Sequence, residues 1–367
     1  MTSTELTIHV FPYRDYEFLE RYGPIVRDLM IIKTLSEFNF VKKVIVYNRP
    51  SSLLEVLLRR RKISYPNKSK YFNDKVEFRS AFLPTIIGPL KGRVWFEDIY
   101  LNCYSAPFND NKLGKHIVLD FLPNAQLPKW VDQLPIYWYD LIDNFVKHNR
   151  FTEKEKYSVS KKYELIASAA NKTITGVSKR SIESFQQGTV LPNAILDDFK
   201  PELFNHSTTT DYEFDFGFIG FVTNKLDVNK IKLLVDSGFK VGIFGEFYDI
   251  SIKEELESLK VYCHGSFVYQ EVFDILKRFK VGLIPYKLEL LHDESPLKLF
   301  QYFASNKYVL TSYGFEMKHK CLINYEETNF LELAQAILNL QAKKEDFEDL
   351  PLFWSDRLIP FLDGLKL

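Results

Sequence analysis

The chain has 367 residues, with 48 basic and 48 acidic side chains and a formal net charge of zero. This length exceeds one ordinary hydrophobic core and fits two domains of fewer than about 200 residues each. Hydrophobic residues make up 46% and charged residues 26%, which indicates a folded globular protein and excludes a disordered chain.

Three features predict where the protein works. The cysteines, Cys103, Cys263 and Cys321, lie far apart, and their odd number suits a reducing compartment. Residues 1–5 are too polar for a signal peptide, and no apolar run reaches the roughly 18 residues that span a bilayer. We therefore expect a cytoplasmic protein whose contact with a membrane is peripheral.

Strand-like apolar runs alternate with helical patterns along the chain, which is typical of a parallel α/β fold. In the first half, strands are predicted at residues 6–11, 44–47, 117–121, 135–139 and 173–175. Gly23-Pro24 predicts a helix start, because proline is tolerated in the first turn, and apolar residues at 25, 29, 32 and 35 keep helical spacing.

A basic stretch lies between positions 41 and 93, where 13 Lys and Arg residues face three acidic ones. Its centre, LLEVLLRRRK at 53–62, predicts a helix whose apolar face runs into a cationic end formed by Arg59, Arg60, Arg61 and Lys62. Such a pattern fits an anionic membrane surface or an anionic acceptor. It fits equally a solvated helix end whose cations interact with the helix dipole. The basic patch is confined, since acidic side chains outnumber basic ones elsewhere, and this argues against nucleic acid as a partner.

The turn at residues 191–194 and the polar stretch at 205–215 predict a boundary between two domains. The alternation then restarts, with strands predicted at 216–220, 240–244, 261–262, 281–284 and 308–310. Helices are expected from 227, near 253, over 271–279, from 296 and around 329–340. We expect domains at 1–195 and 196–350, with 351–367 forming a helix that packs back toward the first domain.

A candidate phosphate site follows the predicted strand at 281–284. In open parallel sheets, ligands bind beyond the carboxyl ends of strands, where helix N-termini favour pyrophosphate. We expect Ser295 to cap the next helix, Pro296 to occupy its first position and Lys298 to lie in its first turn. The same residues also fit an ordinary capped helix with one lysine.

Residues 295–304, SPLKLFQYFA, resemble the donor-binding helix of bacterial GT-B glycosyltransferases. Four further segments agree with that family in order and spacing: WYDLIDNF at 138–145, VLPNA at 190–194, FIGFV at 218–222 and GSFVY at 265–269. The first of these four is similar to a segment of teichuronic-acid and exopolysaccharide biosynthesis enzymes. Each match is short, but five in sequence order are fairly specific.

The resemblance implies a GT-B fold, in which two Rossmann-like domains face each other across a cleft. It implies that the second domain holds a nucleotide diphosphate-sugar, most often a UDP-sugar, and that the first domain holds the acceptor. No resident cofactor is implied, because the nucleotide-sugar is a substrate. Lys298, Ser295 and Pro296 would face the diphosphate. The other donor-side candidates are Asp293, Glu294, Gln301, Gly220, Lys225, Phe267 and Val268.

Three positions differ from the family pattern. Asp293 and Gln301 stand where many retaining members carry two glutamates, and Gln301 has no charge to offer. Phe221 stands where relatives often have arginine, and Lys225 in the same loop is a candidate replacement. Ala194 replaces the usual glycine.

Transfer of the sugar develops negative charge on the leaving diphosphate, which fixed donors and a cation stabilise. The sequence contains no Asp-x-Asp motif, and its Cys-His pairs lack zinc spacing, so we predict metal-independent chemistry and no metal site.

An inverting enzyme also needs a base near the acceptor hydroxyl. Asp143, Asp140 and Asp15 are the candidates, and helix capping is the alternative role for each. Arg14 is a candidate for contact with an anionic acceptor or for pairing with Asp15.

The sequence thus predicts a glycosyltransferase that extends a cell-surface polysaccharide or a lipid-linked glycan at the inner face of the cytoplasmic membrane. Two alternatives stay open. A nucleotide-sugar epimerase of the same fold would need no polymeric acceptor. A non-catalytic GT-B-like subunit would bind glycan or act as a scaffold, and Gln301 and Phe221 are the residues that favour it.

Overall fold

The computed structural model describes residues 5–88, 90, 103–104, 115–126, 136–169, 171–200, 211–290, 295–326 and 329–365. The chain divides into two compact units, Met1–Pro192 with Leu358–Leu367, and Asn193–Arg357. Each unit contains one large parallel sheet, as the sequence predicts, and the first unit has a second, two-stranded parallel sheet. Among the described residues, no helix combines the length and the apolar character that crossing a bilayer requires.

The sheet of the first unit has the order β4-β2-β1-β6-β7-β8-β9, and every neighbouring pair is parallel. Chain order reverses between β1 and β6, so the topological switch point lies between these two strands. The strands are β1 (Leu6–Phe11), β2 (Val41–Tyr47), β4 (Val76–Arg79), β6 (Lys115–Asp120), β7 (Ile136–Leu141), β8 (Lys172–Gly176) and β9 (Thr189–Val190).

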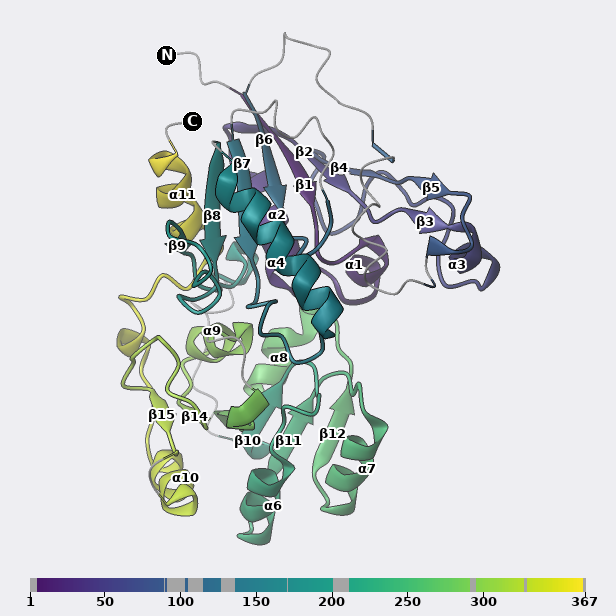
Figure 1. Cartoon of the computed structure of the whole chain (residues 1–367). Helices are drawn as coiled ribbons and strands as arrows, with labels where there is room; N and C mark the ends of the chain where they lie inside the picture. The colour runs from purple at the N-terminus through teal and green to yellow at the C-terminus, as the bar shows by residue number, and fades with distance from the viewer. Residues whose placement is uncertain are drawn as a thin grey trace. The chain divides into compact units, whose positions relative to one another are not determined.

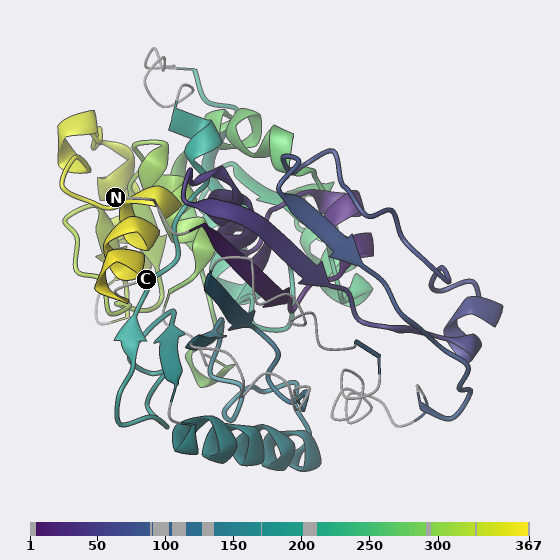
Figure 2. The ribbon, with the colours of Figure 1, turned by 90° about the horizontal axis from the view of Figure 1, so that it is seen from above.

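Side chains of β7 alternate between the two faces of this sheet. Tyr137 and Tyr139 pack in one core cluster with Tyr163 of α4 (Glu153–Ser168). Trp138 points to the other face, where its ring centroid lies 4.8 Å from that of Phe361 in α11 (Trp354–Gly364). α2 (Arg27–Glu37) and α4 lie on opposite faces of the sheet (Figures 1 and 2).

The loop after β1 contains a helix that the sequence pattern did not predict, α1 (Tyr16–Tyr22), capped by Asp15. Gly23 ends α1 with a φ of 76°, a left-handed value that glycine adopts readily. The second helix, α2, therefore begins at Arg27 instead of at Gly23-Pro24.

A projection leaves the main sheet of the first unit (Figures 1 and 2). It consists of residues 51–63 and 82–88, here called the arm, and contains β3 (Ser51–Ser52), α3 (Leu53–Leu57) and β5 (Phe82–Leu83). The predicted helix over 53–62 is wrong beyond its first turn. Arg59 has a φ of 54°, which a right-handed helix does not allow.

The sheet of the second unit has the order β12-β11-β10-β13-β14-β15, again with all neighbours parallel. Its switch point lies between β10 and β13. The strands are β10 (Phe214–Ile219), β11 (Val241–Phe244), β12 (Tyr262–Gly265), β13 (Phe279–Ile284), β14 (Val309–Thr311) and β15 (Leu322–Asn324).

The helices of this unit are α6 (Val228–Asp236), α7 (Ile250–Ser258), α8 (Val272–Lys277), α9 (Leu297–Ala304) and α10 (Phe330–Leu338). Short 3-10 turns add η3 (Asp197–Phe199), η4 (Tyr269–Glu271), η5 (Leu288–Leu290) and η6 (Lys344–Asp346). The predicted helix starting at 227 is confirmed, since Asp227 caps α6 by accepting the N–H groups of Asn229 and Lys230.

Candidate functional site

Two glycines lie at the carboxyl edge of the second sheet, beside its switch point. Gly220 follows β10 with a φ of 113°. Gly245 follows β11, and a Cβ there would lie 1.8 Å from the carbonyl oxygen of Gly220. Only glycine fits at position 245, because the loops after β10 and β11 run in contact. The two loops meet at the edge where open parallel sheets bind ligands, and Gly220 is partly exposed there.

The loops on both sides of the switch point are joined by backbone hydrogen bonds. The N–H of Asp227 donates to the carbonyl of Pro285 at 2.7 Å, and the N–H of Lys287 donates to that of Lys225 at 2.8 Å. Lys225 itself is partly buried in the loop between β10 and α6. These bonds fix the loop after β10 against the loop after β13.

The position of α9 is set by Tyr302. Its ring covers Gly282 of β13, where a Cβ would lie 2.5 Å from the ring. Its hydroxyl accepts the N–H of Ile219 at 3.0 Å and donates toward the carbonyl of Gly217 at 3.1 Å. The helix is thus held to both strands of the switch point.

Lys298, on the first turn of α9, places its ammonium at the same edge. Only 8% of the residue is exposed. Its Nζ donates to the hydroxyl of Tyr286 at 2.7 Å and lies 3.5 Å from the centroid of the Phe218 ring. A Cβ on Gly220 would lie 3.3 Å from this Nζ. A buried cation in contact with aromatic rings thus lies against the backbone of Gly220.

The start of α9 differs by one residue from the sequence prediction. Pro296 is the N-cap, with an extended ψ of 132°, and the helix begins at Leu297. Ser295 does not cap it: its Oγ accepts the N–H of Asn193 at 3.3 Å, and its carbonyl accepts Asn193 Nδ2 at 2.5 Å. Pro296 has no side-chain acceptor, so it leaves the first N–H groups of the helix to other partners.

The remaining donor-side candidates lie at varying distances from this point. Gln301 is buried one turn after Lys298. Phe267 is buried after β12, and the N–H of Val268 donates to Glu271 at 2.8 Å, where it serves a capping turn. Asp293 and Glu294 lie outside the described residues.

Phe221, which stands where the resemblance expects arginine, packs against Tyr248 with ring centroids 5.2 Å apart. The side chain at this position therefore contributes an apolar contact in place of a phosphate-binding cation.

In the first unit, Asp140 is enclosed in the core, with no exposed surface. Arg27 donates to it through Nε and Nη2, both at 2.7 Å, and Thr175 donates at 2.6 Å. Trp138 in turn donates to the Thr175 hydroxyl at 2.7 Å. A base must reach the acceptor hydroxyl, so this enclosure argues against the predicted role of Asp140. Its carboxylate instead joins β7 to α2 and β8.

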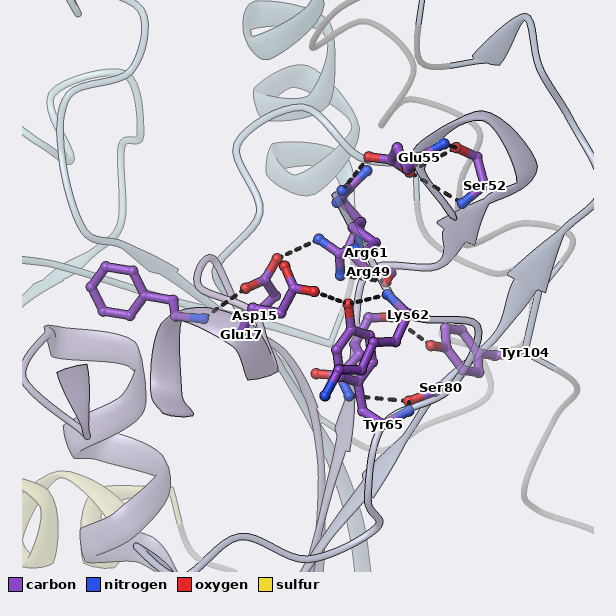
Figure 3. Close-up of polar contacts among 12 residues, drawn as sticks. Asp15, Glu17, Arg49, Ser52, Glu55, Arg61, Lys62, Tyr65, Ser80 and Tyr104 are labelled. Atoms are coloured by element: carbon purple, nitrogen blue, oxygen red, sulfur yellow. Dashed lines mark hydrogen bonds and ion pairs between the residues drawn. The ribbon is translucent and has the colours of Figure 1, made fainter. Parts of the chain in front are cut away.

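Asp15 also has a structural role (Figure 3). One oxygen accepts the N–H of Phe18 at 3.1 Å, and the other pairs with Arg61 at 2.5 Å. Burial would raise the pKa of Asp15, but the Arg61 charge and the Phe18 N–H together hold it below its ordinary value. A carboxylate with a lowered pKa is a weak base.

Asp143 follows β7 at the carboxyl edge, and 15% of its side chain is exposed. One oxygen accepts the N–H of Asn144 at 2.7 Å, and the other lies 3.7 Å from His148 Nε2. His148 Nδ1 accepts the N–H of Arg150 at 3.1 Å, which leaves the ring proton on Nε2, toward Asp143. Of the three predicted bases, Asp143 is the one that is partly exposed and not paired with an arginine in the contacts described above.

His148 was missed by sequence reasoning. It lies five residues after Asp143 in a loop, without a metal-binding or nucleophile pattern around it. Its ring packs against those of Phe145 and Phe151, with centroids 6.1 and 5.0 Å away. Only the fold of this loop turns it toward the carboxylate.

The predicted cationic surface is divided by the fold. Arg61 is 7% exposed and paired with Asp15, so its assignment to a membrane-facing surface is wrong. Arg59, Arg60 and Lys62 are exposed on the arm. Arg14 stacks over the rings of its neighbours Tyr13 and Phe18, 5.2 and 4.7 Å from their centroids.

No group of three or more His, Cys, Asp or Glu side chains suited to hold a metal ion occurs in the part of the chain that the structure covers. Metal independence stays a prediction.

No protein-family model matches the sequence, and no curated protein matches it. Solved structures match it over nearly the whole chain. A glycosyltransferase from Rickettsia africae ESF-5 has a TM-score of 0.55 and 11% identity, with 99% of this chain and 98% of that one covered. AviGT4, a glycosyltransferase involved in avilamycin A biosynthesis, has a TM-score of 0.53 and 9% identity, with 99% and 97% covered.

An α-glucosyltransferase solved with UDP and a 13-mer DNA has a TM-score of 0.54 and 10% identity, with 98% of this chain and 100% of that one covered. At these identities the matches establish the fold. The chain has the GT-B fold of glycosyltransferases, built from two doubly wound α/β units.

Proposed function

We propose that the chain is a glycosyltransferase that moves a sugar from a nucleotide diphosphate-sugar, with UDP as the nucleotide, to a glycan acceptor. The observation that carries this proposal is the Lys298 ammonium at the switch point of the second sheet. It lies beneath the glycine backbone at Gly220, where a diphosphate can approach closely.

The chemistry of the leaving group follows from this placement. As the glycosyl–phosphate bond breaks, negative charge grows on the diphosphate. The Lys298 cation and the first N–H groups of α9 stabilise that charge without moving, because Tyr302 fixes the helix to both strands. We propose that the reaction needs no metal ion.

The first unit supplies the acceptor side of the proposal. Asp143 is the proposed base that takes the proton of the acceptor hydroxyl if the reaction inverts the anomeric centre. Its second oxygen lies 3.7 Å from His148 Nε2, and its first accepts the N–H of Asn144.

For the acceptor we propose a cell-surface polysaccharide or a lipid-linked glycan at the inner face of a membrane. Support comes from the WYDLIDNF segment at 138–145 and its similarity to teichuronic-acid and exopolysaccharide enzymes. The α-glucosyltransferase of similar fold was solved with DNA. We disfavour DNA here because the basic residues are confined to positions 41–93 and acidic residues predominate elsewhere, whereas phosphate neutralisation draws on a larger basic surface.

The test is UDP binding by calorimetry, with EDTA present, on wild type and on Lys298→Met. Methionine keeps contact with the Phe218 ring but removes the charge. We expect metal-free binding that weakens by about tenfold or more, roughly 1.4 kcal/mol, in the variant. Lys232→Met, an exposed lysine on α6, is the matched control and should bind as wild type does. Absence of binding by any nucleotide in wild type would overturn the proposal.

A scaffold or glycan-binding subunit is the second candidate, favoured by the apolar packing of Phe221 against Tyr248. An epimerase of the same fold is the third. Release of free UDP that depends on added glycan acceptor indicates the transferase. UDP binding without turnover indicates the subunit, and sugar conversion without acceptor indicates the epimerase.

A further inference from the structure

Large apolar side chains are exposed at the end of the arm. Leu57, Leu58 and Ile63 on one segment, and Ile86 and Ile87 on the other, are each between 50% and 69% exposed. Single exposed apolar residues are ordinary on protein surfaces. Five on one projection are unusual, and such groups mark interaction surfaces.

The two segments are held together by backbone pairing. Ser51 pairs with Phe82 and Ser52 with Leu83 in parallel register, and the N–H of Leu54 donates to Thr85 at 3.4 Å. The apolar residues therefore belong to one structured element.

The exposed charge on the arm is positive. Arg59, Arg60 and Lys62 are exposed between the apolar positions 58 and 63. The arm contains one acidic residue, Glu55, and its carboxylate is bound by Arg49 at 2.6 Å. The tip thus combines apolar side chains with cations, which is the combination that anionic bilayer surfaces attract.

We propose that the tip of the arm inserts Leu57, Leu58, Ile86 and Ile87 into the interface of an anionic bilayer, with Arg59 and Arg60 at the lipid headgroups. This inference rests on the proposed function, because it gives that function a lipid surface from which the acceptor is taken.

The base of the arm is fixed to the edge that carries the acceptor-side residues (Figure 3). Arg61 pairs with Asp15 after β1 and donates to the carbonyl of Arg49 after β2, at 3.2 Å. The hydroxyl of Tyr65 donates to Glu17 at 2.5 Å. A bilayer bound at the tip is therefore held in a fixed relation to the carboxyl edge of the first sheet.

Other occupants fit these residues less well. In a self-association through the tips, Arg59 and Arg60 of one copy would meet the same cations of the other. Nucleic acid offers phosphates for the cations but no apolar surface for the Leu and Ile side chains.

The experiment is sedimentation of the full chain with vesicles of phosphatidylcholine, alone or with roughly a third phosphatidylglycerol. One variant, Leu58→Ser with Ile87→Ser, removes apolar surface, and a second, Arg59→Gln with Arg60→Gln, removes charge. The control, Tyr157→Ser with Leu165→Ser, removes exposed apolar surface from α4 of the same unit. We expect wild type and control to bind the anionic vesicles, and both arm variants to bind roughly tenfold more weakly.

Three results would overturn the inference: no vesicle binding by wild type, vesicle binding by both arm variants that equals that of wild type, or self-association that is lost in the apolar variant. UDP calorimetry on the same proteins separates the two proposals. Normal UDP binding without vesicle binding removes only this inference, whereas vesicle binding without UDP binding removes the proposed function.

Discussion

The buried pair of Arg27 and Asp140 provides the sharpest test of which carboxylates are structural. Both residues are at most 5% exposed, and two hydrogen bonds of 2.7 Å join them. Arg27→Met leaves the Asp140 charge enclosed and removes both arginine donors, while the Thr175 hydroxyl still donates to it. Breaking a buried pair in this way costs about 3–5 kcal/mol of unfolding free energy. Asp140→Asn leaves the Arg27 charge buried without its carboxylate, and we expect it to lower the free energy of unfolding by a similar amount.

The double variant should lose much less unfolding free energy than the two single variants lose together, because each substitution removes the charge that the other leaves unpaired. We expect a coupling free energy of about 2–3 kcal/mol in the cycle. Urea unfolding of the four proteins, followed by tryptophan fluorescence, measures it. Additive losses, or a stable Asp140→Asn protein that binds donor and acceptor but turns over neither, would refute the structural assignment of Asp140.

Three further predictions concern buried groups. Burial raises the pKa of Asp28 from 3.8 to about 6. Between these two pH values the native chain keeps a proton on Asp28 that the unfolded chain has lost. The free energy of unfolding therefore falls as the pH rises from about 4 to about 6. Asp28→Asn should therefore exceed wild type in stability by about 2–3 kcal/mol at neutral pH and by little at about pH 4, measured by urea unfolding. Burial lowers the pKa of Lys307 to about 7, so wild-type stability should rise between about pH 7 and pH 10, and Lys307→Met should abolish that slope in the same assay. Gly245→Ala, whose Cβ would meet the Gly220 carbonyl, should lower the melting temperature and weaken UDP binding by about tenfold or more, measured by calorimetry.

Much of the second unit could be predicted from its sequence. Its strands are short β-rich runs separated by helical patterns, so local periodicity suffices to place them. The segment at 295–304 fixes Lys298 near a helix start whether the cap is Ser295 or Pro296, because one residue of error does not move it out of the first turn.

The acceptor side could not be predicted to the same depth. Asp140 and Asp143 lie so close in sequence, after the same predicted strand, that both are equally good candidates for the catalytic base. The structure distinguishes them, because Asp140 is buried and paired with Arg27, which lies 113 residues away in sequence. Arg61 was predicted to be exposed for the same reason, since its partner Asp15 lies 46 residues away.

Tyr302 has a consequence for attempts to redesign the site. Because one hydroxyl and one ring fix α9 to both β10 and β13, no substitution on the helix can slide Lys298 along the sheet without first dismantling the core beneath it. Libraries aimed at a new donor should therefore leave the helix alone and vary exposed positions in the loops after β10 and β11, such as Asn224 and Tyr248, while they keep the two glycines and the buried Val222 and Leu226.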